Sequence, residues 1–166
     1  LIQISENQDI ITVLEYRKII EKGTIGLVVP KITPKDIEYL EETYSMMVAL
    51  ANTKEPEKQA SADHLFHFRL AQIAKNPIIT KVYEIINVIL STTMVNVVEL
   101  LGTELGLRYH RQLIDALKSG DKALCESLMD AHIEETIQGI LKKTKGYPGE
   151  TLGSLSELSA NQRKRP

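Results

Sequence analysis

The stretch QASADHLFHFRLAQIA, residues 59–74, decides the fold class of this chain, because its apolar side chains recur with the period of an α-helix. Phe66 and Leu70 lie four residues apart and therefore share one helix face. The same face carries Asp63 and His67, which are also four residues apart. This one segment predicts a packed helix with a carboxylate next to an imidazole on its inner side.

Composition favours a single all-α domain. The chain has 166 residues, of which 43% are hydrophobic, and this is enough apolar material for one core. Its net charge of −2 excludes the basic field typical of domains that bind nucleic acid nonspecifically. The single cysteine, Cys125, excludes an intrachain disulfide. The polar start at Leu1, which has neither a leader pattern nor an initiator Met, indicates a cytoplasmic piece of a longer protein.

The apolar periodicity predicts further helices on both sides of residues 59–74. The first should end at Gly23, and Pro30 should end the short apolar piece that follows it. Thr33 and Asp36 flank a Pro-Lys pair in the pattern of a capped helix start. The predicted helices are 8–22, 34–51, 59–74, 77–101, 103–118 and 122–143, within a domain of residues 1–144 that precedes a mobile tail at 145–166.

Residues 77–101 are apolar around most of the helix circumference. Lys81, Glu84 and Glu99 argue against a membrane span, because charged side chains are costly in a bilayer. A helix of this kind is either central to a bundle or shared between the core and a partner surface. We therefore expect a domain without membrane contact.

Polar residues on inward faces are the second informative feature, because a buried polar group must be paired. Besides Asp63 and His67, His110 shares a face with Leu113, and His132 lies on the inner stripe of the last helix. Each alone is more often a paired core residue, and the first two could form a local ion pair. Together, three nitrogens and one oxygen suit a divalent transition metal, with Zn or Ni first and Mn, Fe or Co as alternatives.

Two other residues each have two interpretations. His64 is rotated by about 100° from its neighbour and should face solvent, although it could replace a ligand three residues from His67. Arg17 lies among apolar residues on the inward face of the first helix. It either pairs with Glu21 at the edge of the bundle or is held in a cavity to bind a carboxylate or phosphate.

At these residues the chain resembles the C-terminal effector-binding domain (FCD) of FadR-type regulators in the GntR superfamily. Residues 63–67, DHLFH, resemble the family's D-x-x-F-H element. Residues 110–121, HRQLIDALKSGD, resemble its H-x-x-(I/L)-(I/L)-x-A-(I/L)-x-x-G-D element. His132 ends a further element, A-x(5)-M-x-x-H, and Arg17 with Glu21 matches R-x-x-(I/L)-E.

The resemblance, which covers residues 14–140, implies an antiparallel bundle of six or seven helices. It implies a metal ion and a small organic acid effector bound beside it, with Arg17 as the carboxylate contact. It also implies a homodimer that binds operator DNA through an upstream winged helix-turn-helix, which this sequence does not contain. Residues 27–30, LVVP, depart from the family's small-residue helix, so the second helix should be shortened or bent there. The implied metal ligands are Asp63, His67, His110 and His132.

A carboxylate-sensing regulator domain is therefore the predicted function, and a small helical metalloenzyme is the alternative. An open site of one Asp and three His could activate water, but no inward Glu or second acid is evident near these motifs as a general base. A third interpretation is a helical dimerisation module whose polar core groups only pair with one another.

Overall fold

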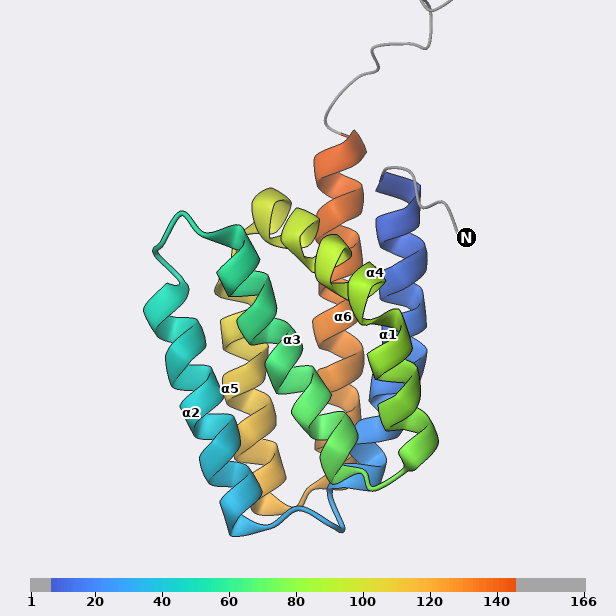
Figure 1. The fold of residues 1–166 in the computed structure, drawn as a ribbon, viewed down its shortest axis with the longest axis vertical. Helices are drawn as coiled ribbons and strands as arrows, with labels where there is room; N and C mark the ends of the chain where they lie inside the picture. Colours follow the sequence, from blue (N-terminus) through green and yellow to red (C-terminus); the bar gives the residue numbers. More distant parts are fainter. Residues whose placement is uncertain (1–6, 146–166) are drawn as a thin grey trace, which may run out of the picture.

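The computed structural model describes residues 7–145, and over this range the chain forms six α-helices and no strand (Figure 1). This confirms the predicted all-α class. The predicted tail begins where α6 ends, and residues 146–166 lie outside the described residues. The helices are α1 (Asn7–Val28), α2 (Pro34–Leu50), α3 (Pro56–Ile73), α4 (Pro77–Leu101), α5 (Glu104–Ser119) and α6 (Lys122–Lys145).

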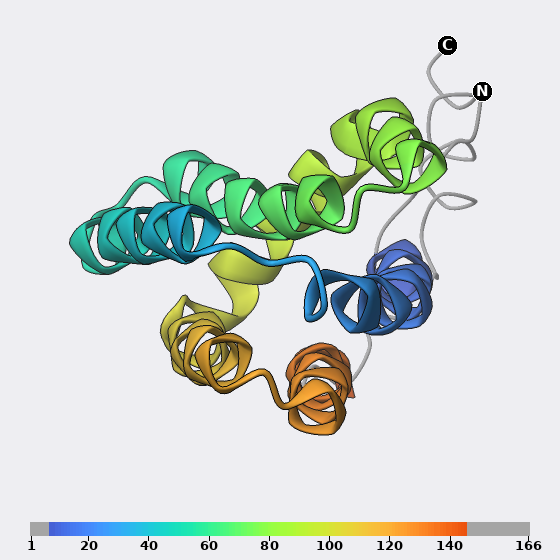
Figure 2. The same cartoon turned by 90° about the horizontal axis from the view of Figure 1, so that it is seen from below.

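The six helices pack as two layers. Seen from below, α2, α3 and α4 lie in one layer and α1, α5 and α6 in the other (Figure 2). Within the layers α1 packs along α6, α5 packs along α6, and α3 packs along both α2 and α4. Contacts of α1 with α3 and of α2 with α5 join the layers. The core lies between them, and the inward faces of α3, α5 and α6 all meet there.

Helix α1 does not end at Gly23, as predicted, but continues to Val28. Its last turns bury Ile25 and Val28 completely. Burying such a side chain stabilises by about 1.5–3 kcal/mol, whereas a glycine inside a helix costs about 1 kcal/mol, so packing outweighs the local preference. The second helix, expected to be shortened or bent at residues 27–30, does not form as a separate element, because residues 27–28 end α1 and the chain then turns into α2.

The remaining boundaries agree more closely with the sequence. Helix α4 has the predicted ends, with the Asn76 side chain accepting from the backbone nitrogens of Ile78 and Ile79. Helix α3 begins at Pro56, three residues before the predicted start. Proline is well suited to a first helical turn, because its missing N–H would have no partner there.

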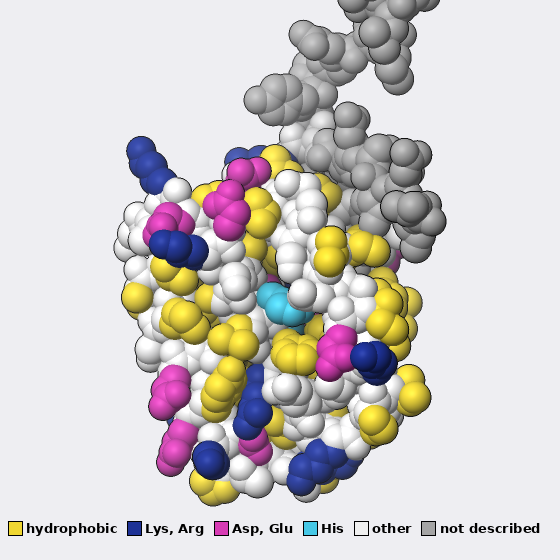
Figure 3. Space-filling model, viewed as in Figure 1, with side chains coloured by type: hydrophobic (Ala, Val, Ile, Leu, Met, Phe, Trp, Pro, Cys, Tyr) yellow, Lys and Arg dark blue, Asp and Glu magenta, His cyan; other side chains and the backbone are white. Residues whose placement is uncertain are grey.

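Helix α4 is shared between the core and the surface. It packs against α1, α3 and α6, but Ile78, Ile85 and Val88 are 70%, 69% and 76% exposed. Hydrophobic side chains gather along the right-hand edge of the face in Figure 3, where α4 and α1 lie. By length and composition alone, α4 is also long and apolar enough to cross a membrane.

The start of α2 is held by a reciprocal cap. Thr33 Oγ1 accepts from the Asp36 backbone nitrogen at 3.2 Å, and Asp36 Oδ2 accepts from the Thr33 backbone nitrogen at 3.1 Å. Arg69 of α3 donates to the other Asp36 oxygen at 2.8 Å, which ties the cap to the next helix.

Thr33→Ala should lower the free energy of unfolding by about 1 kcal/mol, because the first turn of α2 loses its side-chain acceptor. Urea denaturation followed by circular dichroism measures this change. Ser45→Ala is the matched control, since the exposed Ser45 hydroxyl bonds only to the Glu41 carbonyl within α2. An equal loss in both variants would contradict a specific role for the cap.

Candidate metal centre

Four predicted residues meet inside the bundle. Asp63 and His67 come from α3, His110 from α5 and His132 from α6. One ligand atom from each lies within 4.8 Å of the others, and all four residues are buried. Helical periodicity predicted that each would face inward, and the packing of three helices brings them to one point.

The spacing of these atoms fits a transition metal ion. His67 Nε2 lies 3.0 Å from His110 Nε2, and Asp63 Oδ1 lies 3.5 Å from His110 Nε2 and 3.8 Å from His67 Nε2. Two nitrogens bound about 2.1 Å from one ion at a right angle are themselves about 3.0 Å apart. The donor set therefore has the dimensions of a coordination shell.

Several polar atoms of the cluster have no hydrogen bond. Among the described residues, Asp63 Oδ2 and the Nδ1 atoms of His110 and His132 are buried without a hydrogen bond. Burial, reinforced by nearby positive charge, lowers the pKa of His110 and His132 well below 6.5. Both imidazoles are therefore neutral at pH 7, and neutral imidazole is the form that coordinates metals.

Helix α1 adds a buried ion pair to the cluster. Arg17 Nε donates to Glu21 Oε1 at 2.7 Å, and Arg17 Nη2 lies 3.8 Å from Asp63 Oδ2. Arg17 and Glu21 are only 4% and 3% exposed, so the pair forms as predicted but not at the bundle edge. The paired guanidinium also lines a cavity, and its binding of a carboxylate stays a prediction.

Glu21 is the inward acid that the sequence analysis did not find. Its Oε2 lies 2.8 Å from His67 Nδ1, without the angle of a hydrogen bond. Burial alone would raise the pKa of Glu21, but Arg17 and His67 together hold it well below 4.5. The signal was present as a stripe of Leu14, Arg17, Glu21 and Ile25, but the sequence analysis considered Glu21 only as a partner of Arg17 at the edge of the bundle.

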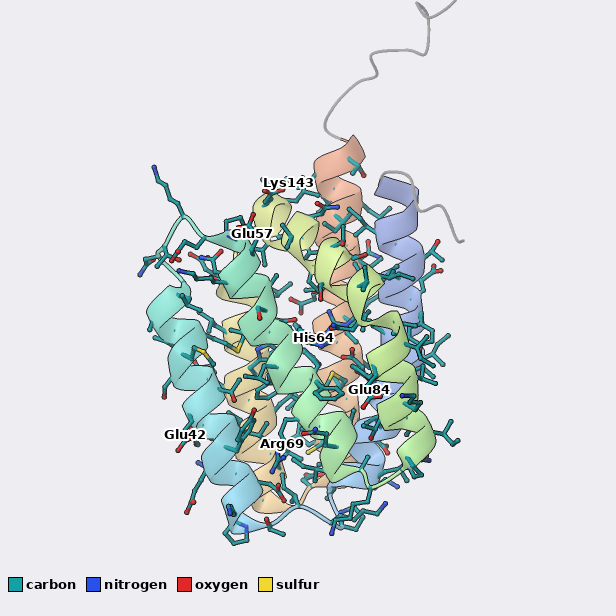
Figure 4. The ribbon with its side chains drawn as sticks, viewed as in Figure 1. Glu42, Glu57, His64, Arg69, Glu84 and Lys143 are labelled. Carbon is teal, nitrogen blue, oxygen red and sulfur yellow. The ribbon has the colours of Figure 1, made fainter. Side chains whose placement is uncertain are left out.

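His64 lies apart from the cluster. It is half-buried on the outer side of α3, where Figure 4 labels it and where Figure 3 shows a histidine near the centre of the face. Its ring stacks on Phe68 with centroids 6.0 Å apart. His64 is thus less solvated than predicted and takes no place in the ligand set.

A partly open cavity adjoins the cluster. Arg17, Asp63 and His132 line it, together with residues 101–103 and 105–107, which run from the end of α4 into the first turn of α5. Gly106 belongs to this wall, and a Cβ there would lie 3.8 Å from Asp63 Oδ1. The sequence analysis missed this wall, because a connection between helices carries no periodic signal.

Residues 12–135 match the FCD domain family. The HTH-type transcriptional regulator LutR of Bacillus subtilis (strain 168) is 24% identical over 149 residues, which cover 84% of this chain and 67% of LutR. The chain thus spans about two thirds of the length of this relative.

Solved structures share the fold. E. coli McbR/YncC has a TM-score of 0.72 at 17% identity, over 85% of this chain and 71% of that one. The metal-free FCD domain of TM0439 has a TM-score of 0.68 at 20% identity, over 86% of this chain and 99% of that one.

The matched residues include the complete buried cluster and most of the described helices. The match also decides between the predicted functions, since it indicates a regulator domain rather than an enzyme. The chain belongs to the FCD domain family and is the effector-binding domain of a FadR-type transcriptional regulator of the GntR family.

Proposed function

We propose that this domain binds a divalent transition metal and, beside it, a small carboxylate effector that alters operator binding. The observation that carries the proposal is the buried ligand set, whose atoms lie within 4.8 Å of one another at the wall of a cavity. In a module whose polar groups only paired, the Nδ1 atoms of His110 and His132 would have hydrogen-bond partners, but both are buried without one.

The metal would be held by Asp63, His67, His110 and His132. Nitrogen-rich sets of this kind suit Zn or Ni first, with Mn, Fe or Co as alternatives. A bound ion supplies positive charge and open coordination positions to which an effector carboxylate can bind. Glu21, close to His67 Nδ1, would orient that imidazole and increase its basicity, as partners of metal-bound histidines commonly do.

Arg17 is the proposed second contact for the carboxylate. Its Nη1 donates to Met94 Sδ at 2.7 Å, and a thioether sulfur is a weak acceptor. A carboxylate in the cavity would be a much stronger acceptor for the same nitrogen. Arg17 could therefore keep its bond to Glu21 through Nε while turning Nη1 to the effector.

Regulation requires that the effector favour one arrangement of the whole protein over another. We propose an upstream winged helix-turn-helix for operator DNA, supported by the HTH-type relative LutR, of which this chain spans two thirds. A cytoplasmic homodimer completes the proposal. The exposed apolar side chains Ile78, Ile85 and Val88 of α4 and Ile19 of α1 offer a surface for a second copy.

Protein purified without chelator should contain about one transition metal ion per chain. His110→Ala should lose most of this metal, because the site loses a buried ligand, whereas His64→Ala should retain it. Elemental analysis by mass spectrometry provides the measurement. Wild-type protein that takes up no ion after reconstitution with Zn or Ni would refute the site.

Arg17→Lys should weaken carboxylate binding roughly ten- to hundredfold, because a charge-assisted bond contributes about 1.5–3 kcal/mol. The metal content should not change, since Arg17 is not a ligand. Calorimetry with acetate, lactate and citrate on Zn-loaded protein tests this. Arg69→Lys is the matched control, because Arg69 bonds to Asp36 outside the cavity (Figure 4). Unchanged affinity in Arg17→Lys would remove Arg17 from the effector site.

Glu21→Gln should lower the affinity for metal roughly 10- to 100-fold, because His67 loses the adjacent negative charge. Competition with a chromogenic chelator measures the affinity, and the melting temperature of the metal-free protein reports any structural damage separately. Glu15→Gln, an exposed substitution on the same helix, should have no effect. Equal metal affinities in the two variants would contradict the role of Glu21.

A further inference from the structure

The cavity beside the ligand set is charged at one end and apolar along most of its remaining wall. Among its lining residues, only Arg17, Asp63 and His132 are ionisable. The rest of the wall is formed chiefly by aliphatic and thioether side chains from several helices. They include Leu14, Met47, Met94, Val97, Leu101 and Ile133.

Three uncharged polar side chains line this wall, those of Gln59, Thr103 and Thr136. Two of them already use their donors within the protein. The side-chain nitrogen of Gln59 donates to backbone carbonyls at the end of α2, at 2.8 Å to that of Leu50. The Thr136 hydroxyl donates to the His132 carbonyl at 2.8 Å. Both residues therefore present oxygen acceptors to the cavity, and an oxygen acceptor cannot stabilise a carboxylate.

The charge at the polar end matches a single anion. Arg17, Glu21 and Asp63 together carry one negative charge, and the imidazoles are neutral when they coordinate a metal. A divalent ion changes this sum to one positive charge, which one carboxylate neutralises. A second carboxylate would find no second cation along this wall, and burying a charge without an opposite charge is strongly unfavourable.

From this wall and this charge balance we infer that the effector is a monocarboxylate with an apolar chain, rather than a di- or tricarboxylate. This inference rests on the proposed function, because it assumes that a metal and Arg17 hold the carboxylate. The carboxylate lies at the Asp63 end, and the chain extends along α4 towards Val97 and Leu101. Affinity then comes from the buried methylenes as well as from the charge.

Hexanoate and adipate form a matched pair of probes, because they have equal length and differ in one terminal carboxylate. Calorimetry on the Zn-loaded chain should give binding that tightens about fourfold per methylene from acetate through butyrate to hexanoate. Adipate should bind at least tenfold more weakly than hexanoate. Adipate or citrate binding as tightly as hexanoate would overturn the inference and leave the proposed function standing. Failure of all carboxylates to bind the metal-loaded protein would overturn both.

A substitution in the wall gives an independent test. Val98 lines the cavity and is partly exposed, so Val98→Lys introduces a second cation where the effector chain should lie. This variant should lose affinity for hexanoate and gain affinity for adipate. Ile85→Lys makes the same change on the exposed side of α4 and should preserve the wild-type preference. An unchanged hexanoate-to-adipate ratio in folded Val98→Lys would show that the chain does not lie there.

Discussion

The burial of one carboxylate and three imidazoles at a single point is the constraint on which the rest of this structure depends. Each group loses its contacts with water, so each needs a partner inside the protein. Phe66, fully buried, stacks on His110 with ring centroids 4.4 Å apart and holds that imidazole in place. Three helices from different parts of the chain must therefore keep their positions for the ligand set to exist.

Helix α1 connects this centre to the rest of the molecule. Its Arg17–Glu21 pair contacts both Asp63 and His67, and the helix packs along α6 over much of its length. In the proposed regulator, an effector that engages Arg17 acts directly on the helix nearest to an upstream DNA-binding domain. Binding would change the partners of the buried Arg17 guanidinium. It would shift the equilibrium between two arrangements of the DNA-binding domain, because the effector would bind them with different affinity.

The predictable parts of the fold were those in which local and tertiary preferences agree. The bounds of α4 followed from Asn76-Pro77 at its start and Gly102 at its end, and the cap of α2 followed from Thr33 and Asp36. The predicted end of α1 was wrong because Gly23 suggested a stop that the burial of Ile25 and Val28 overrides. Glu21 was named as a partner of Arg17 but was placed at the edge of the bundle, because its burial depends on how α1 packs against other helices.

By itself, the sequence determined the helical class and the inward orientation of Asp63, His67, His110 and His132, because periodicity within one helix depends only on local geometry. Its resemblance to FadR-type regulators placed these residues around one metal ion. Only the tertiary structure decided that their donor atoms lie within 4.8 Å, that Glu21 stands beside His67, and that the adjoining wall is apolar. These features depend on how separate helices pack and on the connection between α4 and α5, and neither leaves a periodic pattern in the chain.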